Sequence, residues 1–245
     1  MKKTSNFEIE QFLINLGVSK DDFLIIHADL RVFGLIENYG KDIINIIRSI
    51  VGSNGLIASP SFTFSYPNDF DIIRSESQTG AISRLFSLDP EAIRVPDGMT
   101  SYYLIGNEAN NIVQNWSHSS YGLGSIPDQI LNKNGKVLQI GTDILTYVHF
   151  LEQKVGVPYR FLKRFYGNIV DEDRTYRSYT DFYAREPGIE KLIPDPIRTK
   201  FYSLLKNSIA IENKQLRYFQ TSEYLNYSLP LLKENKEILI NKGII

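Results

Sequence analysis

The chain has 245 residues, 42% of them hydrophobic and 22% charged, with a formal net charge of -1 at pH 7. Basic and acidic residues are mixed along it, so the dense positive surface that nucleic-acid binding requires is missing, and no nucleic-acid partner is expected. The absence of cysteine excludes disulfides, thiolate metal sites and a cysteine nucleophile.

The composition predicts one domain over residues 1–245, although the length alone would allow two small ones. Two lysines near the amino end are followed by Phe7-Glu8-Ile9-Glu10 and not by an uninterrupted apolar segment, and no later run reaches membrane-spanning length. The cytoplasm is therefore the expected location, with no membrane partner.

The first two thirds of the chain alternate between helices and short buried strands. Residues 5–16 predict an amphipathic helix, because Ser5 and Glu8 have the spacing of a capping box and Gly17 follows the last apolar position. Further predicted elements are a buried strand at 23–26, a helix at 41–51, a strand from 56, a short helix from 79–81 to near 90, a strand at 102–105, helices at 107–116 and about 126–133, and a strand at 137–140. This alternation is typical of an α/β fold with a central, mostly parallel sheet flanked by helices.

The last third is less regular. A helix carrying His149 comes first, and beyond Gly167 a segment rich in tyrosine and arginine extends to about residue 188 without a pattern that places it. The remaining predicted elements are a helix at about 196–207, short strands at 209–211 and 216–219, and a helix that begins at Thr221.

Several loops are predicted to meet at one edge of the sheet, where ligands bind in open α/β folds. They are residues 27–34, 61–65, 97–101 and 119–125, together with the helix that carries His149. Their glycines and hydroxyl side chains suit a long, phosphate-bearing ligand laid across strand ends and helix amino termini.

His149 and Glu152 are the first candidates for catalysis. Three residues apart on a helix, they share a face, so His149 could act as a base while Glu152 orients the ring or holds a cationic substrate. The alternative is that His149 packs against the core and Glu152 is solvated. His27, at the end of the first strand, is the second candidate base, and a purely structural histidine is an equally good interpretation of it.

Other common catalytic motifs are missing from the sequence. None of the three histidines has the H-E-x-x-H spacing of a metal site, and no G-x-S-x-G, P-loop or complete G-x-G-x-x-G motif is present. A metal cofactor is therefore not expected.

Five ordered segments carry a family resemblance. They are His27–Gly34, Pro60–Thr63, Thr79–Ile82, Tyr121–Ser125 and, above all, Thr146-x-x-His149-x-x-Glu152. In these segments the chain resembles the aminoglycoside 3-N-acetyltransferase family, antibiotic N-acetyltransferases that are unrelated to the GNAT fold. The resemblance covers residues 7–165, with 166–245 matching loosely and expected to complete the acceptor side.

The resemblance implies a mixed α/β fold, acetyl-CoA as acyl donor, and direct transfer to an amine with His149 as the base. It also implies that the segment after the first strand lines the CoA channel. The residues predicted to bind the donor are Leu30, Arg31, Val32, Phe33, Gly34, Thr63, Ser119, Tyr121, Gly122 and Ser125.

The acceptor side departs from the family pattern. Where aminoglycoside enzymes usually carry His-Pro before a serine-containing strand, this chain has Asp97-Gly98-Met99-Thr100-Ser101. Together with Val157–Arg160 and Lys163, this resembles the branch that acylates amino sugars in surface-polysaccharide biosynthesis. The predicted partners are thus an acyl-CoA and an amino sugar, with a nucleotide-linked sugar as the first choice. Three alternatives are left open: an aminoglycoside as acceptor, a non-catalytic protein that binds CoA or sugar, and assembly as a homodimer.

The residues predicted to bind the acceptor are Asp97, Tyr159, Arg160 and Lys163. The guanidinium of Arg160 could pair with a diphosphate, and a nucleotide base could stack on Tyr159. Arg164 is expected to be solvated. An acidic cleft would favour a polycationic aminoglycoside, whereas a cleft lined by basic residues would favour an anionic nucleotide sugar.

Overall fold

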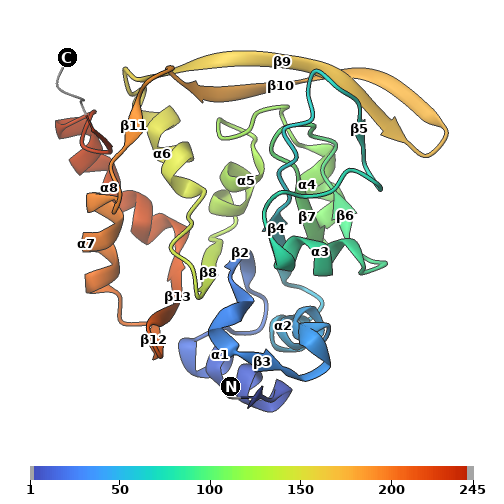
Figure 1. Cartoon of the computed structure of the whole chain (residues 1–245), viewed down its shortest axis with the longest axis vertical. Helices are drawn as coiled ribbons and strands as arrows, with labels where there is room; N and C mark the ends of the chain where they lie inside the picture. The colour runs from blue at the N-terminus through green and yellow to red at the C-terminus, as the bar shows by residue number, and fades with distance from the viewer. Residues whose placement is uncertain (1–2, 242–245) are drawn as a thin grey trace.

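The computed structural model describes residues 3–241. Its centre is a seven-stranded mixed sheet with helices on both faces (Figure 1). The strands, in order across the sheet, are β12 (Ser208–Ile211), β13 (Lys214–Gln220), β8 (Lys136–Ile140), β2 (Phe23–Ala28), β4 (Leu56–Pro60), β7 (Tyr102–Ile105) and β6 (Ile93–Arg94). The α/β class is confirmed. The parallel pairs are confined to the three central strands β8, β2 and β4, and the outer strands pair antiparallel.

The continuous apolar run of β2 is buried on both faces of the sheet, as predicted. Leu24 and Ile26 belong to one core and Ile25 to the other. The first core is packed by α1 (Asn6–Leu16), α2 (Ile43–Val51) and α3 (Ala81–Ser87). The second is packed by α4 (Ala109–Gln114), α5 (Ile126–Asn132), α6 (Tyr147–Val155), α7 (Pro196–Leu204) and α8 (Thr221–Glu234).

Local capping signals set several helix boundaries where the sequence places them. Ser5 and Glu8 form a complete capping box at the start of α1, and Gly17 ends the helix with φ 107°, a conformation that favours glycine. The hydroxyl of Ser125 accepts a hydrogen bond from the backbone N–H of Asp128 and caps α5. These caps fix where the two helices begin through contacts within a single turn, so they do not depend on the rest of the fold.

The tyrosine-rich segment that the sequence pattern did not place is a long β-hairpin. β9 (Arg160–Asp171) pairs antiparallel with β10 (Arg174–Arg185), and β5 (Phe70–Asp71) extends β9 on its other edge. Figure 1 shows the hairpin crossing above α6 and α5. At Gly167 a Cβ would lie 2.1 Å from the ring of Tyr66, so the residue must be glycine for the hairpin to approach that ring.

Two short strand pairs and two 3-10 turns lie outside the large sheet and the hairpin. β1 (Lys3–Thr4) pairs with β3 (Leu35–Ile36), and β11 (Glu190–Lys191) pairs with β14 (Ile240–Asn241). Two 3-10 turns, η1 (Leu30–Phe33) and η2 (Glu37–Gly40), follow β2. Within residues 3–241, no helix combines the length and the apolar character needed to cross a membrane.

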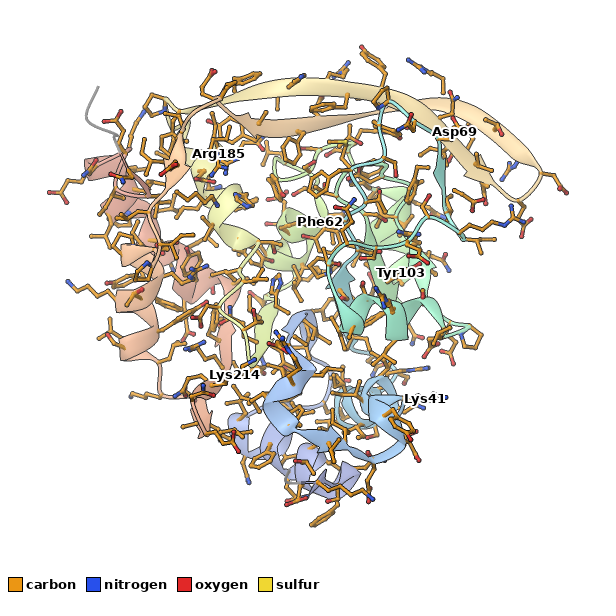
Figure 2. The ribbon with its side chains drawn as sticks, viewed as in Figure 1. Lys41, Phe62, Asp69, Tyr103, Arg185 and Lys214 are labelled. Carbon is orange, nitrogen blue, oxygen red and sulfur yellow. The ribbon has the colours of Figure 1, made fainter. Side chains whose placement is uncertain are left out.

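Because β8, β2 and β4 run parallel, their carboxyl ends lie at the same edge of the sheet. The chain leaves this edge at Ala28, Pro60 and Ile140 and enters the loops that the sequence singled out. Phe62, just beyond β4, lies between the sheet and the hairpin (Figure 2), where its ring contacts Tyr102 edge to face at 5.7 Å. The hairpin thus covers the carboxyl edge of the sheet.

Candidate active site

His149 and Glu152 lie on one face of α6, as their spacing predicts. His149 Nδ1 is 2.8 Å from Glu152 Oε2. The Glu152 side chain is fully buried, whereas the imidazole retains 24% of its exposure. The alternative in which Glu152 is solvated is therefore wrong, and the pair is a partly accessible base with a buried carboxylate behind it.

Two further residues hold the Glu152 carboxylate in place. The Tyr159 hydroxyl donates a hydrogen bond of 3.1 Å to Oε1, and Arg160 Nε lies 2.8 Å from Oε2 as an ion pair. Burial by itself would raise the pKa of Glu152, but the hydrogen bond from His149 and the positive charges of Arg160 and Lys191 outweigh it and lower that pKa to about 2. Glu152 is consequently charged at neutral pH.

The contacts of His149 favour one imidazole tautomer. Nδ1 lies 2.8 Å from Glu152 Oε2 and 3.1 Å from Arg160 Nη2. Arg160 Nη2 can only donate, so its contact would need a lone pair on Nδ1, whereas the Glu152 carboxylate would need a proton there. The contact to the carboxylate is the shorter one and is charge-assisted, so we place the proton on Nδ1. With the proton on Nδ1, Nε2 is the basic nitrogen.

Burial also keeps the imidazole neutral. It lowers the pKa of His149 to about 4, with the charges of Lys191 and Arg160 acting in the same direction and the Glu152 contact opposing them. At pH 7 the ring is thus unprotonated and able to accept a proton from a nucleophile.

A cavity of about 640 Å³ opens at the carboxyl edge of the parallel strands. We call it the donor cavity because Leu30 and Arg31, two of the residues predicted to bind the donor, line it. Four of the five resemblance segments contribute to its wall, through His27–Arg31, Pro60 and Phe62, Thr79–Ile82, and Thr146. This convergence brings together residues more than 100 positions apart in the sequence.

A second cavity of about 240 Å³, the acceptor cavity, lies between α6, β11 and α7. His149 and Glu152 line it together with Lys191, Asp195 and Arg198. Ile144 lines both cavities, so they are neighbours across this side chain. His149 therefore faces one cavity while Thr146, one turn earlier on the same segment, faces the other.

The residues predicted to bind the donor are divided among several places. Leu30 and Arg31 line the donor cavity, whereas Arg31 and Val32–Gly34 line a separate hollow of about 470 Å³ beside β12. Tyr121 and Gly122 line a hollow of about 310 Å³ on another face of α6, with Phe150 and Gln153. The structure does not bring this predicted set into one channel.

The remaining donor candidates have local structural contacts. Thr63 is buried and its hydroxyl donates to the carbonyl of Gly98. The Ser119 hydroxyl accepts from the N–H of Gly122, and Ser125 is the buried cap of α5. These bonds account for the side chains of all three residues without a ligand.

Three of the four residues predicted to bind the acceptor have partners within the protein, and their role in acceptor binding stays a prediction. Asp97 is buried and accepts hydrogen bonds from the hydroxyls of Thr100 and Thr180, so it anchors the hairpin. Tyr159 is buried with its hydroxyl on Glu152, and no face of its ring is free for a base. Arg160 is also buried, because its guanidinium pairs with Glu152 and donates to the Tyr183 carbonyl.

The basic residues further along β9 behave differently. Lys163 is exposed, with its ammonium 4.7 Å from the centre of the Phe165 ring, and it lines neither the donor nor the acceptor cavity. Arg164 is exposed and pairs with Asp181 at 2.7 Å, in agreement with its expected solvation. The basic run after α6 therefore contributes Arg160 alone to the candidate site.

His27 lies in the wall of the donor cavity and is almost completely buried. Its Nε2 is 3.4 Å from the Thr146 hydroxyl, and burial lowers the pKa of His27 to about 3. The imidazole thus ties β2 to the start of α6 in the neutral state. The catalytic role of His27 stays a prediction. The contact with Thr146 gives the buried imidazole the polar partner that a purely structural histidine needs.

Sequence reasoning missed Lys191, Asp195 and Arg198 in the acceptor cavity. Asp195 caps α7 through the backbone N–H of Arg198 at 3.0 Å, and the Asp195-Pro196 pair is a helix-start signal that could have been read. Lys191 had no such signal, because β11 is placed by pairing with β14 some 50 residues later. Within residues 3–241 there is no cluster of three or more His, Cys, Asp or Glu that could hold a metal ion.

A large side chain placed in the donor cavity should weaken CoA binding. Ala81 is exposed in the wall of this cavity at the start of α3, so Ala81→Phe is expected to raise the Kd for CoA about tenfold or more, which corresponds to about 1.4 kcal/mol. Calorimetry measures the effect. Arg84→Phe, at an exposed position of the same helix, is the control and should bind CoA normally. Normal affinity in a folded Ala81→Phe protein would remove the donor assignment from this cavity.

Comparisons with known proteins show the family to which the fold belongs. The family model described as aminoglycoside 3-N-acetyltransferase matches residues 25–233. Aminoglycoside N(3)-acetyltransferase III of Serratia marcescens is 24% identical over 169 residues, which span 60% of this chain and 63% of that relative.

Solved structures show the same fold. AAC-IIIb in a binary complex with CoASH superposes with a TM-score of 0.82 at 19% identity, covering 95% of this chain and 97% of that one. Sisomicin-bound AAC-VIa superposes with a TM-score of 0.80 at 19% identity, covering 95% of this chain and 99% of that one. The YokD protein of Bacillus subtilis superposes with a TM-score of 0.78 at 17% identity, covering 95% of this chain and 100% of that one. Because the family model covers well over half of the chain, continuing through the hairpin and into α8, this chain belongs to the aminoglycoside 3-N-acetyltransferase family.

Proposed function

We propose that this protein transfers an acetyl group from acetyl-CoA to an amine of an amino sugar. The observation that carries the proposal is the neutral His149, backed by a buried and charged Glu152, beside two neighbouring cavities. Membership of an N-acetyltransferase family supports the reaction type, and the CoASH held by AAC-IIIb supports the donor. The larger cavity suits the donor and the smaller one the acceptor amine.

The chemistry follows from the position of the imidazole. The acceptor nitrogen attacks the thioester carbonyl carbon, and Nε2 of His149 takes a proton from it as the carbon–nitrogen bond forms. The carbon–sulfur bond then breaks, and the proton passes to the departing thiolate, which gives an amide and CoA. Glu152 stabilises the imidazolium that exists between these two proton transfers.

Two acceptor classes have support of different kinds. The family description, the Serratia relative and sisomicin-bound AAC-VIa all point to aminoglycosides. The nucleotide-linked amino sugar of surface-polysaccharide biosynthesis was argued from Tyr159 and Arg160, and both side chains are committed to Glu152. That acceptor consequently needs support from other residues of the acceptor cavity. The intact His149–Glu152 pair favours turnover over a non-catalytic binding role.

An acetyl-transfer assay tests the proposal directly. Release of free CoA from acetyl-CoA would be followed with aminoglycosides, free amino sugars and nucleotide-linked amino sugars, and products would be weighed by mass spectrometry. A mass gain of one acetyl group on at least one amine is expected. CoA binding without transfer to any acceptor in the three panels would contradict the proposed activity and support the non-catalytic alternative.

A further inference from the structure

Two cations line the acceptor cavity without a hydrogen-bonded or ion-paired partner among the residues that the structure describes. Lys191 lies on β11 and Arg198 on the first turn of α7, and both line the cavity beside His149. Among residues 3–241, neither side chain makes a hydrogen bond or lies within ion-pair distance of a carboxylate. Both are half-buried, so water solvates them less well than it does an ordinary surface lysine or arginine.

The nearby acids are already engaged. Glu152 is shared between His149 and Arg160, and Asp195 caps α7 through the N–H of Arg198. With His149 neutral, the side chains that line the cavity carry the positive charges of Lys191 and Arg198 and the negative charges of Glu152 and Asp195. Arg160, paired with Glu152 behind the lining, adds a third positive charge. A net positive charge repels a polycationic ligand and attracts an anionic one.

The pKa of Lys191 agrees with an ammonium that has no carboxylate within ion-pair distance. Burial, together with the charges of Arg160 and Arg185 and against those of Glu152 and Asp195, lowers this pKa to about 8. At neutral pH the ammonium is still mostly charged. A bound anion would relieve this unfavourable environment.

We propose that Lys191 and Arg198 bind an anionic group of the acceptor, so that the acceptor is an amino sugar bearing a phosphate or a carboxylate. The inference deepens the proposed function and rests on it for the identity of the cavity. A planar guanidinium on α7 and a mobile ammonium on β11 can bind one phosphate or carboxylate while the amine of the same sugar lies at His149. This pair takes over the role that the sequence had assigned to Arg160.

Binding measurements test the inference without requiring turnover. Calorimetry would compare glucosamine 1-phosphate, 2-amino-2-deoxyglucuronate and uncharged glucosamine on the protein saturated with CoA. At least one of the two anionic sugars is expected to bind about tenfold or more tightly than glucosamine, since charge-assisted hydrogen bonds are the stronger ones. The two anionic probes distinguish phosphate from carboxylate.

Variants assign the preference to the two side chains. Lys191→Met and Arg198→Met should each remove most of the preference for the anionic sugar. Lys191→Arg keeps the positive charge and should retain that preference. Lys200→Met is the matched control, because Lys200 lies on α7 two residues from Arg198 but is exposed. Thermal unfolding would verify that each variant is folded.

The inference is overturned if the wild-type protein binds no probe, if it binds all three equally, or if the preference persists in both methionine variants. These outcomes are separate from failure of the proposed function. Acetyl transfer to uncharged or polycationic amines alone would keep the activity and reject the anionic acceptor. An anion preference without transfer to any amine would keep the binding pair and reject the activity.

Discussion

Replacing His149 by alanine is expected to lower the turnover number by on the order of 10² to 10⁴, the usual contribution of a general base. The residue is the one neutral, partly exposed base lining the acceptor cavity in the described part of the chain, and its ring is oriented by the Glu152 carboxylate at 2.8 Å. Steady-state kinetics would report the loss, and calorimetry should show nearly unchanged CoA affinity, since the donor cavity lies beyond Ile144.

His118→Ala is the matched control for this experiment. His118 stacks on Tyr179 of β10, lies tilted against Trp116 and lines neither cavity, so its loss should leave turnover nearly unchanged. If His149→Ala retained near-wild-type turnover, the base would have to be another group, and His27→Ala would be the next variant to measure.

The pH dependence of the reaction carries a second signature of His149. A pKa lowered to about 4 means that the base is lost only as the pH falls toward that value, so no decline in kcat/KM from this group is expected around pH 6.5. A decline that sets in at a higher pH as the pH is lowered belongs to the acceptor amine, which must itself be unprotonated to attack. An acid limb centred near 6.5 that disappears in His149→Ala would show that burial does not control the imidazole.

Helix boundaries and the buried central strand were predictable from short-range signals. Ser5 with Glu8 and Ser125 with Asp128 each satisfy backbone donors within one turn, so their geometry depends on nothing distant. The strand β2 was predictable as buried on both faces because its apolar residues follow one another without alternating with polar ones. The His149–Glu152 contact is of the same kind, because α-helical spacing alone puts the two side chains on one face.

The hairpin and the acceptor cavity depend on contacts that local patterns cannot report. Much of β9 is exposed on both faces, so its side chains show no clear alternation of polar and apolar residues. The partner of Arg160 is a carboxylate on the preceding helix, and the sequence indicates a guanidinium there without indicating what it binds. Lys191 enters the cavity only because β11 pairs with the far carboxyl end of the described chain. In each case the missing information is a long-range pairing.

The second large effect concerns the stability of the site. Arg160→Met is expected to lower the free energy of unfolding at pH 7 by about 3 to 5 kcal/mol, the usual cost of leaving a buried charge without its partner. The variant would leave the fully buried Glu152 carboxylate without its ion-pair partner, although the hydrogen bonds from His149 and Tyr159 remain. It would also remove the hydrogen bond to the Tyr183 carbonyl. Denaturant unfolding would measure the loss. Arg164→Met is the control, because its exposed pair with Asp181 should contribute no more than about 1 kcal/mol.

The dependence of this loss on pH separates the ion pair from simple packing. In the wild-type protein the pKa of Glu152 is lowered to about 2, so the carboxylate stabilises the fold above its unfolded pKa of about 4.5, and this contribution is lost as the pH falls toward 2. Without Arg160 the pKa should rise, and protonation then relieves the stranded charge. The difference between Arg160→Met and wild type should therefore shrink between pH 7 and pH 4.5, and Glu152→Gln in the Arg160→Met background should recover part of the stability at pH 7. A loss that is the same at both pH values and is unaffected by Glu152→Gln would mean that Arg160 acts through packing and the Tyr183 carbonyl alone.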